Sequence, residues 1–161
     1  MNSGNQLLSI AAVFILQLLI LTANKHNIER TLIKNTNKAV LAASSVAQSI
    51  IEEIQNKAFD ETTVLKSVSD DKDLTDVLYL GTDTGELIIT QFDDIDDYNG
   101  YVTEIDLEDI GKFQVSVQVN YRKNMYTEQL SSKQTFVKAV TVTVDNFSLA
   151  NPIKFSQIIA Y

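Results

Sequence analysis

An uncharged apolar run near the amino terminus constrains this chain more than any other feature. Residues 7–23 are LLSIAAVFILQLLILTA, 17 residues without a charged side chain. As an α-helix, the run would extend about 26 Å, close to the ~30 Å hydrocarbon core of a bilayer. Because water solvates such a surface poorly, the run needs lipid or other protein around it.

The helical pattern continues beyond the apolar run. Residues 24–58 contain neither Gly nor Pro, and apolar side chains recur there mostly at three- and four-residue spacing. These side chains belong to Ile28, Leu32, Ala39, Ala43, Val46, Ala47, Ile50, Ile54 and Ala58. The pattern predicts one helix over residues 4–58, apolar on all sides at first and amphipathic later. At about 80 Å, such a helix would be much longer than a membrane anchor requires.

The remainder of the chain predicts an acidic connector and a β-sheet head over residues 59–161. Residues 59–76 are polar and indicate a connector with a short turn of helix. We expect strands at 77–80, 86–92, 101–105, 112–122, 135–144 and 153–161. The pattern is clearest at 112–122, where apolar and polar residues alternate, and Val140, Val142 and Val144 share one side of the next strand.

Together these patterns predict an α+β fold with two parts, residues 1–58 and 59–161. One long N-terminal helix would pack, through its carboxyl-terminal half, on an antiparallel sheet of four to six strands.

The charges are unevenly distributed. The formal net charge of −8 argues against nucleic acid as a partner. Residues 60–109 hold sixteen acidic residues and two lysines, whereas residues 110–161 hold six basic and two acidic residues. We expect the two segments to attract each other, within one head or between copies. The basic residues that could meet an acidic segment of another copy are Lys112, Arg122, Lys123, Lys133, Lys138, Arg30 and Lys34.

The acidic loop at residues 93–100, DDIDDYNG, is the candidate metal site. Calcium takes six to eight oxygen ligands, and this loop offers them from Asp93, Asp94, Asp96, Asp97 and Asn99. The spacing is not that of an EF-hand. Two interpretations are open at this point, a calcium site and a solvated acidic loop.

The residue types that catalysis most often uses are scarce. The chain has one histidine, His26, and no cysteine. His26 lies at the edge of the apolar run, and one histidine without cysteine leaves no Ser/His, Cys/His or zinc constellation. We therefore expect no enzyme activity.

The basic residues near the apolar run all follow it. Lys25, Arg30, Lys34 and Lys38 lie on its carboxyl side, and no basic residue precedes it. By the positive-inside rule, the carboxyl part would remain in the cytoplasm. The alternative is that a basic leader has been removed.

The predicted architecture resembles type IV pilins and the pseudopilins of type II secretion systems. Within it, two stretches resemble minor pilins of the mannose-sensitive haemagglutinin type: residues 46–54 (VAQSIIEEI) followed by 58–61 (AFDE), and residues 92–101 (FDDIDDYNGY). The resemblance implies that a prepilin peptidase cleaves a basic leader just before Met1, which then carries a methylated amino terminus. That removal would resolve the conflict with the positive-inside rule.

The resemblance also implies a function, that of a structural subunit of a type IV pilus-like extracellular filament. Before assembly, the chain would reside in the inner membrane. The pilus assembly machinery would then polymerise it into a homo-oligomeric helical filament at the cell surface. Its interface would comprise Leu7, Leu8, Ile10, Val13, Phe14, Gln17, Leu18 and Leu21. The alternatives are a minor pseudopilin of a secretion system and a single-pass membrane-anchored binding module.

The sequence departs from the pilin pattern in three respects. It opens Met-Asn-Ser-Gly-Asn, whereas most pilins open Phe-Thr-Leu-Ile-Glu. Pilins usually have glutamate as the fifth mature residue, and many have helix breakers near residues 14 and 22. This chain has Asn5, Phe14 and Thr22. We therefore expect an unbroken helix through residues 10–25.

Overall fold

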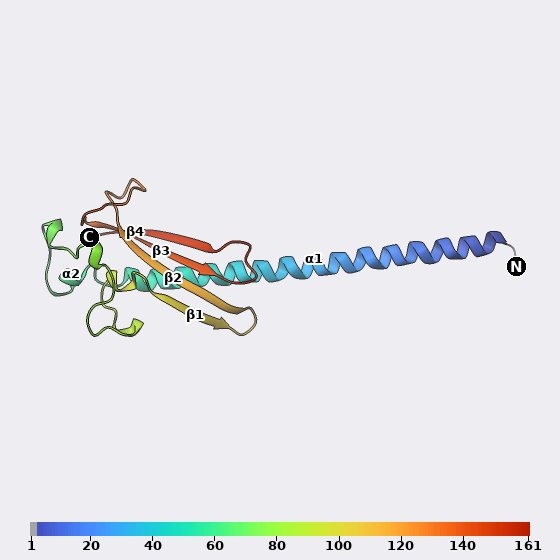
Figure 1. Ribbon diagram of the computed structural model, residues 1–161, viewed down its shortest axis with the longest axis horizontal. Coiled ribbons are helices and arrows are strands. Elements are labelled where there is room, and N and C mark those ends of the chain that lie inside the picture. Colours follow the sequence, from blue (N-terminus) through green and yellow to red (C-terminus); the bar gives the residue numbers. More distant parts are fainter. Residues whose placement is uncertain (1–2) are drawn as a thin grey trace. The chain divides into compact units, whose positions relative to one another are not determined.

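The computed structural model describes residues 3–161, and Figure 1 shows the order of the elements along the chain. The fold is α+β, with a long N-terminal helix packed on a four-stranded antiparallel sheet, as the sequence predicts. The chain divides after Lys38 into two compact units, which are described separately. The elements in the described range are α1 (Ser3–Gln55), α2 (Glu61–Leu65), the 3-10 helices η1 (Asp71–Asp73), η2 (Val77–Tyr79), η3 (Ile89–Gln91) and η4 (Asp96–Tyr98), and the strands β1 (Val102–Leu107), β2 (Gly111–Tyr121), β3 (Val137–Asp145) and β4 (Ile153–Ala160).

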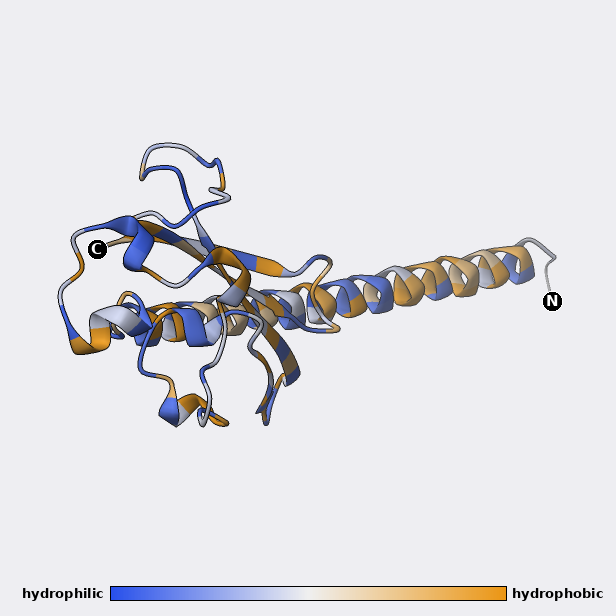
Figure 2. Ribbon diagram, turned by 60° about the vertical axis from the view of Figure 1, so that its left-hand side comes forward, coloured by the Kyte–Doolittle hydropathy of each residue, from blue (hydrophilic) through white to orange (hydrophobic). Residues whose placement is uncertain are grey.

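The first unit is helical in the residues described. Helix α1 is continuous through residues 10–25, as predicted, and hydrophobic colouring dominates its amino-terminal part in Figure 2. The hydroxyl groups of Ser9 and Thr22 donate hydrogen bonds to the carbonyl oxygens of Asn5 and Leu18, at 2.9 and 2.8 Å. These polar side chains therefore find their partners one turn earlier in their own helix.

The second unit contains a sheet in which each strand pairs with the next along the chain, all antiparallel. Strand β2 is central to it, and its side chains at every second position, Phe113, Val115, Val117, Val119 and Tyr121, are buried. The register places Val117 opposite Val142 of β3. Val140, Val142 and Val144 are all buried, which confirms the prediction that they share one side of their strand.

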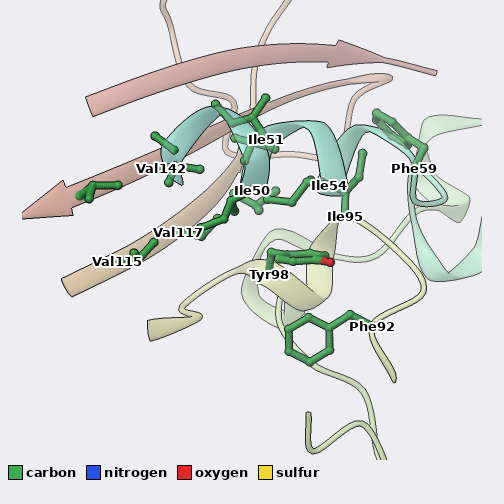
Figure 3. Close-up of a cluster of buried hydrophobic side chains, with 14 of the residues drawn as sticks. Ile50, Ile51, Ile54, Phe59, Phe92, Ile95, Tyr98, Val115, Val117 and Val142 are labelled. Carbon is green, nitrogen blue, oxygen red and sulfur yellow. The ribbon is translucent and has the colours of Figure 1, made fainter. Parts of the chain in front are cut away.

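Residues 39–55 of α1 form the other layer of this core. Ala39, Ala43 and Ala47 recur every fourth residue and are fully buried, since small side chains allow the helix backbone to approach the sheet closely. Beyond them the larger Ile50 and Ile54 fill the space, and Figure 3 shows them among side chains of the sheet and of the loop before β1.

Helix α1 ends at Gln55, three residues earlier than the sequence predicts. Ala58 instead forms a short bridge with the acidic loop: its N–H donates to the Asp93 carbonyl oxygen at 3.0 Å, and its own carbonyl oxygen accepts from the N–H of Ile95, also at 3.0 Å. In a helix that continued to Ala58, this N–H would donate to the Ile54 carbonyl oxygen instead, so the pairing with Asp93 competes with a longer helix.

Two of the predicted strands are wrong. Residues 77–80 and 86–92 contain the 3-10 helices η2 and η3 instead. The Asp76 carboxylate accepts a hydrogen bond from the N–H of Leu78, and the Gln91 side-chain oxygen accepts from the N–H groups of Leu87 and Ile88. These local bonds occupy backbone donors that a β-ladder would need.

Ile54 tests the packing of α1 on the sheet. Replacing this fully buried residue with alanine should lower the free energy of unfolding by about 2–5 kcal/mol, because it leaves a cavity between the two layers. The matched control, Leu65→Ala, changes a side chain that is 85% exposed and should cost less than about 0.5 kcal/mol. Chemical denaturation of the full chain in detergent measures both; equal losses would contradict the packing described here.

Candidate functional site

The predicted interface residues all lie on the exposed surface of α1. Leu7, Leu8, Ile10, Val13, Phe14, Gln17, Leu18 and Leu21 are exposed, and Phe14 is 63% exposed. The helix contains a stretch long and apolar enough to cross a membrane, by length and composition.

The exposed surface of this stretch is apolar on every side of the helix. Ile15, Leu16, Leu19 and Ile20 are more than half exposed as well, so large apolar side chains face all directions rather than forming one stripe. A single groove on one partner would cover only one side. Lipid, or several neighbouring helices, would be needed to cover the whole circumference.

The acidic loop, residues 93–100, is largely buried. This excludes the interpretation of the sequence in which the loop is solvated. Of its four aspartates, Asp94, Asp96 and Asp97 are buried and only Asp93 is exposed. The loop supplies its own donors: the Asp94 carboxylate accepts from the N–H groups of Asp96 and Asp97, and the Asp97 carboxylate accepts from those of Asp93 and Asp94. These bonds compensate for burial of the carboxylates, which composition alone does not reveal.

Asp96 belongs to a buried ion cluster, which comprises Asp60, Asp96 and Lys138. The Lys138 ammonium on β3 lies 2.7 Å from Oδ1 of Asp96 and 3.0 Å from Oδ2 of Asp60, and it donates to the carbonyl oxygen of Phe59 at 2.7 Å. Asp60 also accepts hydrogen bonds from the N–H of Thr75 and from the Tyr121 hydroxyl. One cation therefore joins the residues after α1, the acidic loop and the sheet.

The cluster corrects one of the charge predictions. Lys138 is fully buried, so it cannot meet the acidic segment of another copy. The attraction between the acidic and basic segments operates here within one head, as it does in the exposed pair of Lys112 with Glu104 on neighbouring strands.

The two carboxyl groups of the cluster have different environments. Burial acts to raise the pKa of Asp60, but Lys138 and the hydrogen bonds from Thr75 and Thr62 outweigh it and hold that pKa below its ordinary value. Burial raises the pKa of Asp96 to about 7, although Lys138 acts in the opposite direction. The cluster thus contains one carboxyl group whose pKa is lowered and one whose pKa is raised, so Asp96 takes up a proton before Asp60 does as the pH falls.

The structure divides the five predicted calcium ligands. Asp93 and Asp97 lie together, joined by Glu86, with carboxylate oxygens of all three within 4.8 Å of one another. Asn99 is engaged elsewhere, since its side chain donates to the Leu80 carbonyl oxygen and accepts from the N–H of Val119. Asp94 and Asp96 are held by the contacts already described. Partial burial and the adjacent Asp97 carboxyl raise the pKa of Glu86 to about 7.

Comparison of the chain with protein-family models, with curated proteins and with solved structures finds no match.

We expect Asp94 to make the stability of the head depend on pH. Burial, followed by the neighbouring Asp96 and Asp97 carboxylates, raises its pKa from 3.8 to about 8. The folded chain therefore holds this proton more tightly than the unfolded chain, and stability should fall as pH rises through that range. Because one pKa unit corresponds to about 1.4 kcal/mol, we expect a loss of at least that size between pH ~5 and ~8.

The substitution Asp94→Asn isolates this effect. The amide keeps an oxygen for the N–H groups of Asp96 and Asp97 but carries no charge. Denaturation at a series of pH values should show a smaller pH dependence in this variant than in the unchanged chain or in the exposed control Asp109→Asn. Identical pH profiles would exclude Asp94 as the cause.

The calcium hypothesis stays a prediction, narrowed to Glu86, Asp93 and Asp97. A divalent cation would relieve the mutual repulsion of their carboxylates, and a ligand that binds the folded state raises its stability. Millimolar calcium should raise the melting temperature of the full chain, and Glu86→Gln should abolish the rise. The exposed control Glu108→Gln should keep it. If millimolar calcium leaves the melting temperature unchanged, the calcium hypothesis is wrong.

Proposed function

We propose that this chain is a structural subunit of a type IV pilus-like extracellular filament that polymerises through the apolar part of α1. The observation that carries the proposal is the all-round exposure of large apolar side chains between residues 7 and 21. In the membrane, lipid covers this surface. Once a copy leaves the membrane, equivalent helices of other copies take the place of lipid.

The energetics favour such an exchange. Burying a leucine, isoleucine or phenylalanine side chain contributes roughly 1.5–3 kcal/mol, and this stretch holds many of them. Several helices around each copy would cover all its sides, which a single partner could not. The continuous helix through Phe14 and Thr22 supplies an uninterrupted surface for that packing.

The proposed life cycle rests on the resemblance to type IV pilins. A prepilin peptidase would process the chain before Met1, which lies outside the described residues. The inner membrane would hold the unassembled chain, and the pilus assembly machinery would transfer it to a filament at the cell surface.

Two alternatives use the same helix differently. A minor pseudopilin would occupy only the tip of a short assembly. A single-pass membrane-anchored binding module would keep its helix in lipid and act through its head. The position and number of copies in extracellular material separate the three.

Phe14→Ala tests the filament proposal. Loss of a buried phenyl ring costs about 3–5 kcal/mol. Because about 1.4 kcal/mol corresponds to a tenfold change in an equilibrium constant, filament yield should fall at least about tenfold. The substitution stays apolar, so membrane insertion should persist. Electron microscopy of sheared cell-surface material, with labelled antibody against the head, measures the yield and places the copies along the filament.

Phe147→Ala is the matched control, because Phe147 is an exposed phenylalanine of the head. It should leave filament yield unchanged, and the membrane content of each variant should equal that of the original chain. Label confined to filament tips would favour the pseudopilin, whereas chain found only in the membrane would favour the anchored module.

A further inference from the structure

We propose that the buried ion cluster is the site of a covalent cross-link, an amide bond between the Lys138 side chain and the Asp96 side chain, with Asp60 as the proton acceptor. The three side chains meet within the head although they come from distant parts of the sequence. The Lys138 ammonium lies 2.7 Å from Asp96 and 3.0 Å from Asp60, and the side chains are 0–4% exposed.

The strand register supplies the nucleophile. Lys138 is the direct neighbour of Tyr121 across β2 and β3, and it occupies a position on the same side of β3 as Val140 and Val142. Its ammonium lies 4.5 Å from the centre of the Phe59 ring and 5.0 Å from that of Tyr121. Lys138 is 0% exposed, so bulk water does not reach the nitrogen and cannot separate it from the two carboxyl groups.

The hydrogen bonds assign different roles to the two carboxyl groups. Asp60 is fixed by donors from Thr62, Thr75 and Tyr121, in addition to Lys138. These donors favour its ionised form, which suits a proton acceptor. Oδ2 of Asp96 is buried and has no hydrogen-bond partner among residues 3–161. Its burial favours the acid form, whose carbonyl carbon is the one an amine can attack.

The reaction needs no group from outside the cluster. The Asp60 carboxylate accepts a proton from the Lys138 ammonium, and the resulting amine attacks Cγ of Asp96 in its acid form. A C–N bond forms, the C–OH bond breaks, and the hydroxyl group leaves with a second amine proton as water. Asp60 keeps the proton that it took. The charged cluster is thereby converted into an amide and a neutral acid, and the acidic loop is tied to β3.

Mass spectrometry of the purified full-length chain tests the cross-link. We expect the intact mass to be lower than the sequence mass by one water molecule. Trypsin should fail to cleave after Lys138, and the peptide that contains Lys138 should be recovered joined to the one that contains Asp96. A succinimide at an aspartate would lose the same mass, but it would leave the cleavage after Lys138 intact.

Three variants complete the test. Lys138→Arg keeps the positive charge but should restore the full mass. Asp60→Asn should slow formation of the bond by about a hundredfold or more, the usual contribution of a positioned acid–base group. Circular dichroism confirms that each variant is folded. Lys112→Arg changes the exposed pair with Glu104, which is equally close at 2.6 Å, and should leave the cross-link unaffected.

Measurements on the chain without substitutions are enough to overturn the proposal. A full sequence mass together with complete cleavage after Lys138 would show that the cluster is an ion pair and nothing more. A mass deficit that persists in Lys138→Arg would place the lost water elsewhere and would equally exclude this bond.

Discussion

The structure depends on how one continuous helix satisfies two kinds of surroundings. Residues 39–55 of α1 present alanines and isoleucines to the sheet, so this part is covered within its own chain. Among the residues that the structure describes, residues 7–21 are exposed, and they are apolar on all sides of the helix. Water is a poor solvent for that surface, which makes lipid or further helices a physical requirement. The proposed filament meets this requirement with copies of the chain itself.

The head is organised around a second constraint, the burial of charge. A buried ammonium is tolerated only when charged or polar partners surround it. Lys138 has two carboxyl groups, a carbonyl oxygen and two aromatic rings around it. The cluster holds together the residues that follow α1, the acidic loop and β3. The same closeness that fixes these segments is what makes an amide bond between two of them chemically accessible.

The sequence predicts the elements that have strong periodicity. The long helix follows from three- and four-residue spacing, and β2 follows from the strict alternation between Phe113 and Tyr121. The predictions fail where local side-chain bonds decide the structure. Asp76 and Gln91 bind nearby backbone N–H groups, so apolar stretches that resemble strands become 3-10 helices. The end of α1 also depends on a distant partner, because Ala58 pairs with the acidic loop.

The candidate sites are less predictable because they are assembled from distant segments. The acidic loop can be recognised in the sequence. Glu86 lies outside this loop, and only the fold brings its carboxyl group close to those of Asp93 and Asp97. The position of Lys138 in the sequence does indicate that its side chain is buried. It lies two residues before Val140 and so continues the inward-facing positions of β3, where an ionised side chain requires a buried partner. Nothing local to Asp60 identifies it as that partner.

The most direct measurement is to record what residue 18 contacts when the chain leaves the membrane. A photoreactive amino acid in place of Leu18 would capture any neighbour, and isotopically labelled copies would distinguish a second chain from the same one. In sheared extracellular material, we expect the captured peptide to come from the apolar part of α1 of another copy. A photoreactive group at Phe147 should not capture that peptide. Capture of lipid or of an unrelated protein alone, with no second copy, would contradict assembly through this helix.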